Sequence, residues 1–467
     1  MKILIQGKPI ALIFHILTSY SVSIFLIFLT FFFYLFPVKH AGFFYDAKQY
    51  WEFGELFFKD GRFSLVHYFH ETRGYFLPLF YLPGHYLEMY LGLSPVIYVR
   101  LIGALTGAML FGYVMPRLWE VVSNSGRLHW ARRFLVAMIG LAFWSHYFIY
   151  PLSDFPTALI LGFSLLLILE RPSFLKFILA GFLLGAAVNG RPVYLIVVPV
   201  MLGLVVLSGG RNGIRSLQKH FLPFLIGFCL VSLPQFLINQ QHLGVHSPFM
   251  QTKYQGRNLY LAQLEWGLKI QKYETNIGDG YPDAKVFFTD PAGLAILSAE
   301  KLTEIESFGA YLNLVKKYPV DFCALYVRHL FNGLDIQYPT PYVVNFRKFH
   351  WAVVLLNYTV IFLALTVLLF RKIERMNWPA AGVLCIILLP CFIAIPTAME
   401  CRFLLAIHLL IYALVCFGWP ADWKPQYFSL HAKLKYLAIY IIFLLACFAI
   451  STSTQANLEF GARLIGV

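Results

Sequence analysis

Long apolar segments separated by short polar ones constrain this chain more than any other feature. About eleven apolar runs are candidates for membrane helices, and they lie near residues 10–36, 91–115, 134–150, 156–169, 173–188, 192–207, 220–238, 349–370, 379–396, 402–419 and 434–450. Hydrophobic residues make up 59% of the 467 residues and charged residues only 13%, which is too little charge for a soluble domain. The sequence therefore predicts an all-α polytopic membrane protein.

The positive charges between these runs predict how the helices are oriented. With the N-terminus in the cytoplasm, Lys and Arg accumulate in the inner segments, whereas the short outer loops hold only Arg191 and Arg402. We therefore interpret the net charge of +14 as orienting the helices, and we expect no nucleic-acid partner. The inner cations are Lys2, Lys8, Arg117, Arg127, Arg132, Arg133, Arg171, Lys176, Arg211, Arg215, Lys219, Arg371, Lys372, Arg375, Lys424, Lys433 and Lys435.

This orientation places two large segments on the outer face, together with a C-terminal tail of about residues 451–467. Residues 239–348 are too polar to span a membrane and too many for a simple connection. Apolar residues at helical spacing over Pro291–Tyr318 predict that they fold as a small cap. The expected division is a transmembrane module over residues 1–238 with an outer loop at 38–90, an outer loop domain over 239–348, and C-terminal transmembrane helices over 349–467.

An acidic residue, Asp46, follows the first apolar run within an aromatic segment. Tyr50, Trp51, Phe53 and Leu56–Phe58 recur at helical spacing after it, which predicts an amphipathic helix in the membrane interface. Asp46 would lie at the N-terminus of that helix. Two roles fit a carboxylate there: capping backbone N–H groups, or acting as a catalytic base.

Other polar residues are expected on the same face, each with two interpretations. Arg73 precedes an aromatic, proline-containing stretch and either snorkels at the interface or binds a lipid phosphate. Asp154 lies in a short outer loop, where it caps the next helix or joins a catalytic site. Arg191 lies in a tight outer hairpin and has the same two interpretations as Arg73. Glu400 and Arg402 either pair and cap a helix, or line an outer cavity.

Acids and arginines at membrane level are costly unless they are paired or used. A site that transfers a group away from a phosphate would use both: Asp46 would take a proton from an acceptor hydroxyl, and the arginines would hold the phosphate. Such a site needs no metal or other cofactor. His67 and His70, three positions apart, are either ligands of a divalent metal or two interfacial histidines.

The order of these features resembles the GT-C superfamily of membrane glycosyltransferases. The chain is most similar to the branch that holds the protein O-mannosyltransferases and the bacterial transferase that adds aminoarabinose to lipid A. The motifs that carry the resemblance are Asp46-Ala47-Lys48-Gln49-Tyr50, Arg73 through Pro83, Arg100-Leu101-Ile102-Gly103-Ala104, Asp154, Arg191-Pro192 and Glu400-Cys401-Arg402-Phe403-Leu404. The chain departs from the family at Ala47, where a second acid is common, and at Arg73, where Lys is usual.

The resemblance implies a GT-C-type fold and a reaction at the outer face of a bacterial inner membrane, among membrane lipids. A sugar would pass, with inversion, from a polyprenyl-phosphate donor to a lipid, glycan or protein acceptor. Asp46 and Asp154 would be catalytic, and the donor would be bound by Arg73, Arg191, Arg402, Lys48, Glu400 and Tyr50. Aromatic residues would form the rim of the site, namely Phe43, Phe44, Tyr45, Trp51, Tyr75 and Tyr81.

Three other classes fit parts of the pattern. An O-antigen polymerase or ligase is also polytopic with a large outer loop, but relies on Arg and His rather than on an Asp after the first helix. A lipid or glycan transporter should carry its charges at mid-membrane, whereas the acids here lie at helix ends. A scaffold whose outer loop binds a partner is the non-enzymatic alternative.

Overall fold

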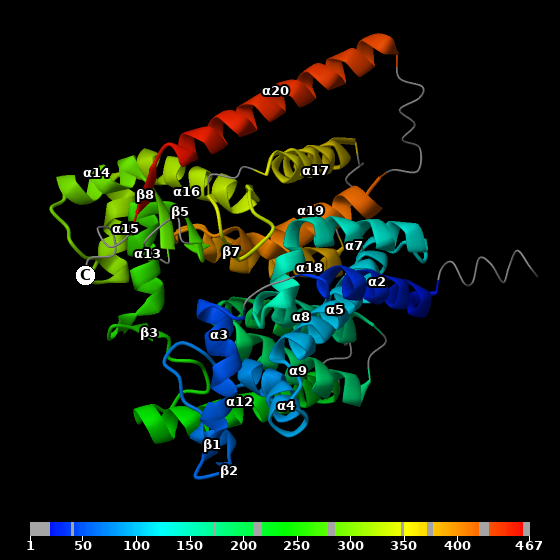
Figure 1. The fold of residues 1–467 in the computed structure, drawn as a ribbon, viewed down its shortest axis with the longest axis vertical. Coiled ribbons are helices and arrows are strands. Elements are labelled where there is room, and N and C mark those ends of the chain that lie inside the picture. Colours follow the sequence, from blue (N-terminus) through cyan, green and yellow to red (C-terminus); the bar gives the residue numbers. More distant parts are fainter. Residues whose placement is uncertain are drawn as a thin grey trace, which may run out of the picture. The chain divides into compact units, whose positions relative to one another are not determined.

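The computed structural model describes residues 19–38, 42–170, 173–208, 217–278, 285–346, 350–370, 377–419 and 429–460. The chain is predominantly α-helical with minor β-sheets (Figure 1), which confirms the all-α class. It divides into two compact units. The first holds Met1–Met250, Ile373–Ile386 and Tyr412–Gly418, and the second holds Gln251–Lys372, Ile387–Ile411 and Trp419–Val467. The N-terminus and the last residues of the tail, which we assigned to opposite sides of the membrane, lie outside the described residues.

The first unit is built mainly from apolar helices. These are α2 (Tyr20–Leu35), α5 (Pro95–Met109), α6 (Met115–Ser123), α7 (Trp130–Trp144), α8 (Asp154–Leu169), α9 (Phe174–Gly190), α10 (Val198–Ser208) and α12 (Leu222–Leu243). Short 3-10 and π segments continue or join them at η3 (Leu110–Val114), η4 (Ser145–Ile149), η5 (Pro192–Val197) and η6 (Leu217–Phe221). Parts of α18 (Trp378–Ala394) and α19 (Leu405–Phe417) also belong to this unit.

The segment 38–90 that we expected on the outer face, described at residue 38 and from residue 42 onward, folds into short elements of the first unit. These are α3 (Tyr45–Glu52), η1 (Phe53–Phe57), β1 (Phe58–Lys59), β2 (Arg62–Phe63), η2 (Leu65–His67) and α4 (Phe76–Leu91). The amphipathic helix expected over residues 50–58 therefore ends as an α-helix at Glu52. Asp60 and Gly61 have φ of 51° and 73°, so they form a two-residue turn between β1 and β2. Asp-Gly favours a turn of this kind.

Two glycines allow α9 and α12 to approach closely, and the two helices lie side by side in Figure 1. A Cβ on Gly181 would lie 1.9 Å from the carbonyl oxygen of Phe224, and one on Gly227 would lie 1.9 Å from that of Ile178. Small residues at such positions let the backbones of membrane helices pack directly against each other. This contact determines where the last turn of α9 lies against α12.

A buried ionic cluster lies at the start of α2 and the end of α6. Glu120 is 3% exposed and Arg133 is fully buried; Arg133 Nη2 lies 3.8 Å from Glu120 Oε1. Arg117 reaches both Glu120, at 3.3 Å, and Glu170, at 3.0 Å. Glu170 directly follows α8, which begins at Asp154. Polar groups therefore lie at both ends of this apolar helix, about 24 Å apart at 1.5 Å per residue.

The second unit combines a four-stranded sheet with helices. Its elements are β3 (Lys253–Tyr254), β4 (Arg257–Asn258), α13 (Leu259–Lys269), β5 (Ile270–Asn276), β6 (Lys285–Thr289), α14 (Pro291–Ala299), α15 (Phe308–Lys317), α16 (Pro319–Leu334), β7 (Tyr342–Val343), α17 (Trp351–Phe370), η7 (Cys401–Leu404), α20 (Leu430–Gln455) and β8 (Leu458–Phe460). The helical pattern expected over Pro291–Tyr318 is divided between α14 and α15. The division falls before Ser307, whose hydroxyl caps α15 by accepting from the N–H of Ala310 at 3.1 Å.

The sheet joins the chain's C-terminal segment to the polar segment 239–348. The strand order is β7-β5-β6-β8, with β7 parallel to β5 and the other pairs antiparallel. β8 pairs directly with β6, where Phe287 lies opposite Glu459. Because paired strands lie in the same compartment, residues 458–460 and the 239–348 segment are on one side of any membrane that the helices cross.

Four described helices are long and apolar enough to cross a membrane, or five if one bent pair forms a single span. The four are Pro95–Ser123, Gln218–Leu243, Trp351–Phe370 and Leu430–Gln455. In the bent pair, Trp130–Ile149 meets Asp154–Leu169 at 117°. Shorter apolar helices cover the other apolar runs: Tyr20–Leu35, Phe174–Gly190, Pro192–Ser208, Trp378–Ala394 and Cys401–Phe417. The chain therefore has the helices of a membrane protein, with four to five candidate spans.

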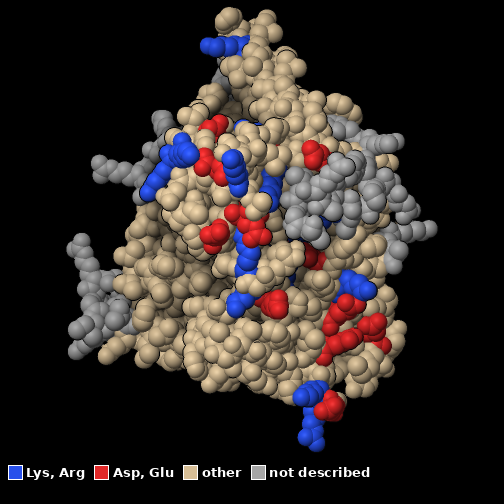
Figure 2. Space-filling model, turned by 90° about the vertical axis from the view of Figure 1, so that its left-hand side faces the viewer, with Lys and Arg blue, Asp and Glu red and all other residues tan. Residues whose placement is uncertain are grey.

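Charged side chains of both signs lie next to one another on the face drawn in Figure 2. Ion pairs within the second unit include Arg328 with Asp290 at 2.7 Å and Lys269 with Glu265 at 2.8 Å. Asp290 also caps α14 by accepting from the N–H of Gly293 at 2.9 Å. Pairs with a buried carboxylate such as these hold secondary structure elements together.

Candidate active site

Asp46 lies in the first turn of α3 in the first unit. Its side chain is 34% exposed, so the carboxylate is accessible. The N-cap position is held by Phe44, so Asp46 lies two residues further along than the capping interpretation requires. Tyr45 between them has φ of 40°, in the left-handed region that side chains rarely adopt. A backbone held in such a conformation is commonly associated with functional sites.

Arg73 is the cation next to Asp46. Its Nη2 lies 3.8 Å from Asp46 Oδ1, and its side chain is 28% exposed. The guanidinium also lies over the ring of Tyr50, 5.4 Å from the ring centre. The hydroxyl of Tyr50 in turn donates to Ser153 Oγ at 3.5 Å. Tyr50 therefore connects Arg73 to Ser153, the residue before Asp154.

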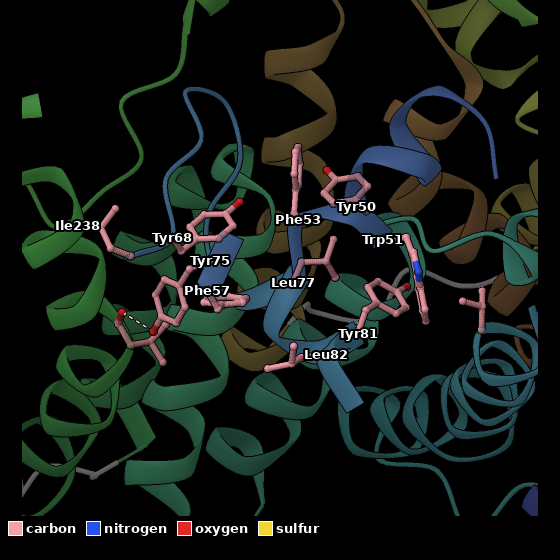
Figure 3. Packing of buried hydrophobic residues seen from close by; sticks show 12 residues of the cluster. Tyr50, Trp51, Phe53, Phe57, Tyr68, Tyr75, Leu77, Tyr81, Leu82 and Ile238 are labelled. Carbon is pink, nitrogen blue, oxygen red and sulfur yellow. Dashed lines mark hydrogen bonds between the residues drawn. The ribbon is translucent and has the colours of Figure 1, made fainter. Parts of the chain in front are cut away.

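The backbone around Arg73 is held from several sides. The hydroxyl of Tyr68 donates to the carbonyl oxygen of Arg73 at 3.1 Å, and that of Tyr75 donates to the carbonyl of Val231 at 3.0 Å. Gly74 lies directly against Asn189, where a Cβ would come within 2.3 Å of the Asn189 carbonyl oxygen. Figure 3 shows Tyr68 and Tyr75 within the buried cluster that supports this turn. Only glycine fits at position 74. Its lack of a side chain lets the turn that carries Arg73 pack against Asn189, two residues before Arg191.

Asp154 and Arg191 form the second acid–arginine pair. Asp154 is the first residue of α8 and is 1% exposed, and Arg191 follows the last residue of α9. Arg191 Nη1 donates to Asp154 Oδ1. The hydroxyl of Tyr81 holds the preceding loop by donating to the carbonyl of Leu152 at 3.2 Å. The structure thus has two acid–arginine pairs drawn from four segments of the chain, and Tyr50 links the first pair to Ser153, the residue before Asp154.

Arg100, the first residue of the motif Arg100–Ala104, has a structural role at the end of α2. Its Nη1 donates to the carbonyl of Phe36 at 2.6 Å, and its Nη2 donates to the carbonyl of Val38. These carbonyls lie at the C-terminal end of α2, where a cation is favoured by the helix dipole. Arg100 therefore holds the chain where it leaves the first helix on its way to Asp46.

Lys48 and Tyr50 have different surroundings from those expected of donor-binding residues. Lys48 forms an exposed ion pair with Glu52 at 3.6 Å, of a kind that contributes little to stability. Tyr50 is only 5% exposed, so its contribution is made through Arg73 and Ser153. Lys48 therefore lies apart from the contacts that join the two acid–arginine pairs.

Glu400 and Arg402 belong to the second unit and pair with each other. Arg402 Nε donates to Glu400 Oε2 at 2.7 Å, and the side chains of Arg402 and Glu400 are 15% and 2% exposed, respectively. The ion pair expected between Glu400 and Arg402 is therefore present. The expected helix cap is not: within the described structure, the Glu400 side chain accepts no capping hydrogen bond at the start of η7.

A buried pair on β5 was not foreseen from the sequence. Lys272 Nζ lies 3.3 Å from Glu274 Oε1, and both side chains are less than 10% exposed. Burial raises the pKa of Glu274 to about 7; Lys272 opposes the shift, whereas Glu400 and Asp335 add to it. Burial is the main cause of the raised pKa of Glu274, and the two neighbouring carboxylates add to it. Alternating charged residues on a strand with both faces buried are the signal that sequence inspection could have used.

The aromatic rim expected around the site is only partly present. Trp51, Tyr75 and Tyr81 are 7%, 3% and 2% exposed, and they form part of a buried cluster in Figure 3 rather than a rim. Tyr45 is 44% exposed and fits the expectation. The buried rings pack under the Arg73 turn because α3 and α4 fold against each other.

Of the two histidines considered as metal ligands, His70 has other contacts. His70 Nδ1 accepts from the N–H of Thr72 at 3.2 Å, and its ring packs on Phe53 at 4.3 Å. Burial and the nearby Arg73 lower the pKa of His70. Within the described ranges, no group of three or more His, Cys, Asp or Glu side chains is placed to hold a metal ion.

Comparison of the chain with protein-family models, with curated proteins and with solved structures finds no match in any of the three. The functional interpretation therefore depends on the residues of this chain and on the motifs noted above.

Proposed function

We propose that this chain is a membrane-embedded glycosyltransferase of GT-C type that uses a polyprenyl-phosphate-linked sugar. The observation that carries the proposal is the link through Tyr50, which contacts Arg73 of the Asp46–Arg73 pair and bonds to Ser153, the residue before Asp154 of the Asp154–Arg191 pair. An accessible acid beside an accessible arginine suits a reaction that needs both a base and a cation for a phosphate. The acceptor is a lipid, a glycan or a protein.

In the proposed reaction, Asp46 accepts the proton of an acceptor hydroxyl. The acceptor oxygen forms the new bond to the anomeric carbon, while the bond from that carbon to the phosphate oxygen breaks with inversion. The electron pair of the broken bond leaves with the prenyl phosphate, and Arg73 offsets its charge. Donor phosphate would compete with Asp46 for the Arg73 guanidinium, which releases the carboxylate for proton transfer.

Arg191 has a narrower role in this scheme than Arg73. Its partner Asp154 is nearly fully buried. Because a buried carboxylate without its cation would destabilise the fold, Arg191 stays paired with Asp154. Arg191 would contact the phosphate with the guanidinium edge that does not face Asp154. Glu400 and Arg402 enter the proposal as further donor contacts only on the family resemblance.

We further propose that all eleven apolar runs cross or enter the membrane, with the N-terminus cytoplasmic. The pairing of β8 with β6 supports an even number of crossings between the 239–348 segment and the tail. The ionic cluster of Arg117, Glu120 and Arg133 would lie on the cytoplasmic side. The setting that fits these features is a bacterial inner membrane.

Mass spectrometry of cell-surface glycans and lipids, with and without the gene, tests the function. We expect one glycan or lipid to lose a sugar in the deletion strain and to regain it when the gene is restored. Unchanged glycans together with altered uptake or export of a lipid-linked sugar would favour a transporter instead. Loss of long glycan chains, with their single units still present, would favour a polymerase.

A further inference from the structure

Three buried amide side chains form a hydrogen-bonded chain behind the two arginines. Asn189 on α9, and Gln235 and Asn239 on α12, are 6%, 1% and 2% exposed. Asn189 Nδ2 donates to Gln235 Oε1 at 2.8 Å, and Gln235 Nε2 donates to Asn239 Oδ1 at 2.9 Å. Polar groups buried in an apolar helix pair are costly unless each is bonded, and here each amide bonds to the next.

Backbone groups at the two ends give the chain of amides a single direction. At one end the N–H of Phe76 donates to Asn189 Oδ1 at 2.8 Å. At the other end Asn239 Nδ2 donates to the carbonyls of Ser247 and Phe249, at 2.7 and 2.8 Å. Because an N–H only donates and a carbonyl only accepts, all three amides have one orientation each. Asn189 is thereby held in a single position.

Asn189 lies between the two arginine-bearing turns. The N–H of Phe76 belongs to the first residue of α4, which has no acceptor within its own helix. Tyr75 at the N-cap makes no side-chain capping bond in the described structure, so Asn189 supplies the cap from α9. The carbonyl of Asn189 also lies against Gly74. Arg73 comes directly before Gly74, and Arg191 follows Asn189 by two residues.

We propose that Asn189 is a positioning residue that sets the separation of the Arg73 and Arg191 guanidinium groups. The inference rests on the proposed function, since the ligand that needs this separation is the donor phosphate. Gln235 and Asn239 act one step further away, by holding the Asn189 amide in place. Two guanidinium groups held at a set separation by rigid helices suit the several oxygens of one phosphate.

The test uses the full chain in detergent and a prenyl monophosphate without sugar as the probe. Asn189→Leu should weaken probe binding about tenfold, because it removes the acceptor of the Phe76 N–H while nearly keeping the side-chain volume. Arg73→Ala should weaken it by a similar factor, and the double variant should bind no more weakly than Arg73→Ala alone. Additive losses would show that Asn189 does not act through Arg73, and would overturn the inference.

Ser173→Ala is the matched control. Ser173 caps the opposite end of the same helix by accepting from the N–H of Lys176 at 3.3 Å. This variant should lose stability without any change in probe binding. Where Asn189→Leu fails to fold, Gln235→Leu replaces it, with a smaller expected loss of about threefold. Full affinity in Gln235→Leu would also contradict the inference.

Hydrogen exchange separates this inference from the proposed function. Peptides covering residues 74–80 should exchange faster in Asn189→Leu and at the unaltered rate in Ser173→Ala. Unchanged exchange in Asn189→Leu would overturn the positioning role whatever the affinity does. Failure of the unaltered chain to bind the probe would remove the proposed function, whereas the exchange result alone still decides whether Asn189 holds the Arg73 turn.

Discussion

Arg191 and Asp154, 37 positions apart in the chain, form an ion pair in which the Asp154 side chain is 2% exposed and the Arg191 side chain 17%. One residue follows the end of α9 and the other begins α8, so the pair joins two helix termini. Its neighbour, Asp46 with Arg73, is more exposed on both sides. The two pairs therefore differ in exposure. The Asp154–Arg191 pair is largely buried, whereas the Asp46–Arg73 pair is accessible to a ligand.

Removing Arg191 alone should destabilise the chain strongly. Arg191→Met leaves the buried Asp154 carboxylate without its cation, and we expect a loss of about 3 kcal/mol in the free energy of unfolding. The double variant Arg191→Met with Asp154→Leu should be more stable than Arg191→Met, because no buried charge remains. Thermal unfolding of the purified variants in detergent checks this. A double variant as unstable as the sum of the two single variants would show that the pair is not coupled.

Replacing the Asp46 carboxylate should abolish sugar transfer and leave folding intact. Asp46→Asn removes the proton acceptor but keeps the size of a side chain that is one-third exposed, and we expect activity to fall by at least about a hundredfold. The measurement is restoration of the missing surface glycan in a deletion strain. Asp60→Asn is the matched control, because Asn-Gly suits the β1–β2 turn as well as Asp-Gly does. Near-normal transfer by Asp46→Asn would remove Asp46 as the base.

Removing the Arg73 guanidinium should weaken use of the donor. Arg73→Ala should raise the donor concentration needed for half-maximal rate about tenfold, because a charge-assisted contact to phosphate is lost. Arg62→Ala, on the exposed β1–β2 hairpin, is the matched control and should leave that concentration unchanged. An unaltered donor dependence in both Arg73→Ala and Arg191→Ala would rule out these arginines as the phosphate site.

Alanine should have opposite effects at two helical glycines. Gly181→Ala places a methyl group 1.9 Å from the Phe224 carbonyl, so α9 and α12 must separate, and we expect a loss of about 3 kcal/mol. A Cβ on Gly203, within α10, would have no atom of the described residues within 4 Å, so Gly203→Ala should stabilise by up to about 1 kcal/mol. Melting temperatures compare the two variants directly. Equal shifts would contradict the close packing of α9 on α12.

The stability of the second unit should depend on pH through Glu274. Burial raises its pKa from an ordinary 4.5 to about 7, so the folded state holds this proton more tightly than the unfolded state. The resulting stability is fully present below about pH 4.5 and is lost as the pH rises through about 7. Glu274→Gln, which cannot ionise, should reduce this dependence. Melting temperatures of both chains across that range provide the measurement, and parallel curves would exclude Glu274 as the source.

Hydropathy located the helices well because a membrane helix must bury its backbone polar groups and expose apolar side chains, and both requirements are local. All the apolar runs are covered by helices, although the run at 10–36 is described only from Tyr20 onward. Local pattern was less successful in the polar segments. The periodicity after Asp46 runs to Phe58, whereas the α-helix ends at Glu52, and Pro291–Tyr318 concealed the capped start of α15.

The sequence by itself determined the helical membrane class and the chemical types gathered around Asp46, Arg73, Asp154 and Arg191. Only the tertiary structure decided which of these residues meet. Pairing of residues 37 positions apart depends on how α8, α9 and α12 pack, and that packing is set by contacts such as Gly181 against Phe224. The buried amides behind the site could not be foreseen for the same reason. The alternating charges at Lys272 and Glu274 are visible in the sequence, but their burial is decided by the tertiary structure. A polar residue in an apolar segment shows that a partner exists, but the partner's identity depends on the packing of segments distant in sequence.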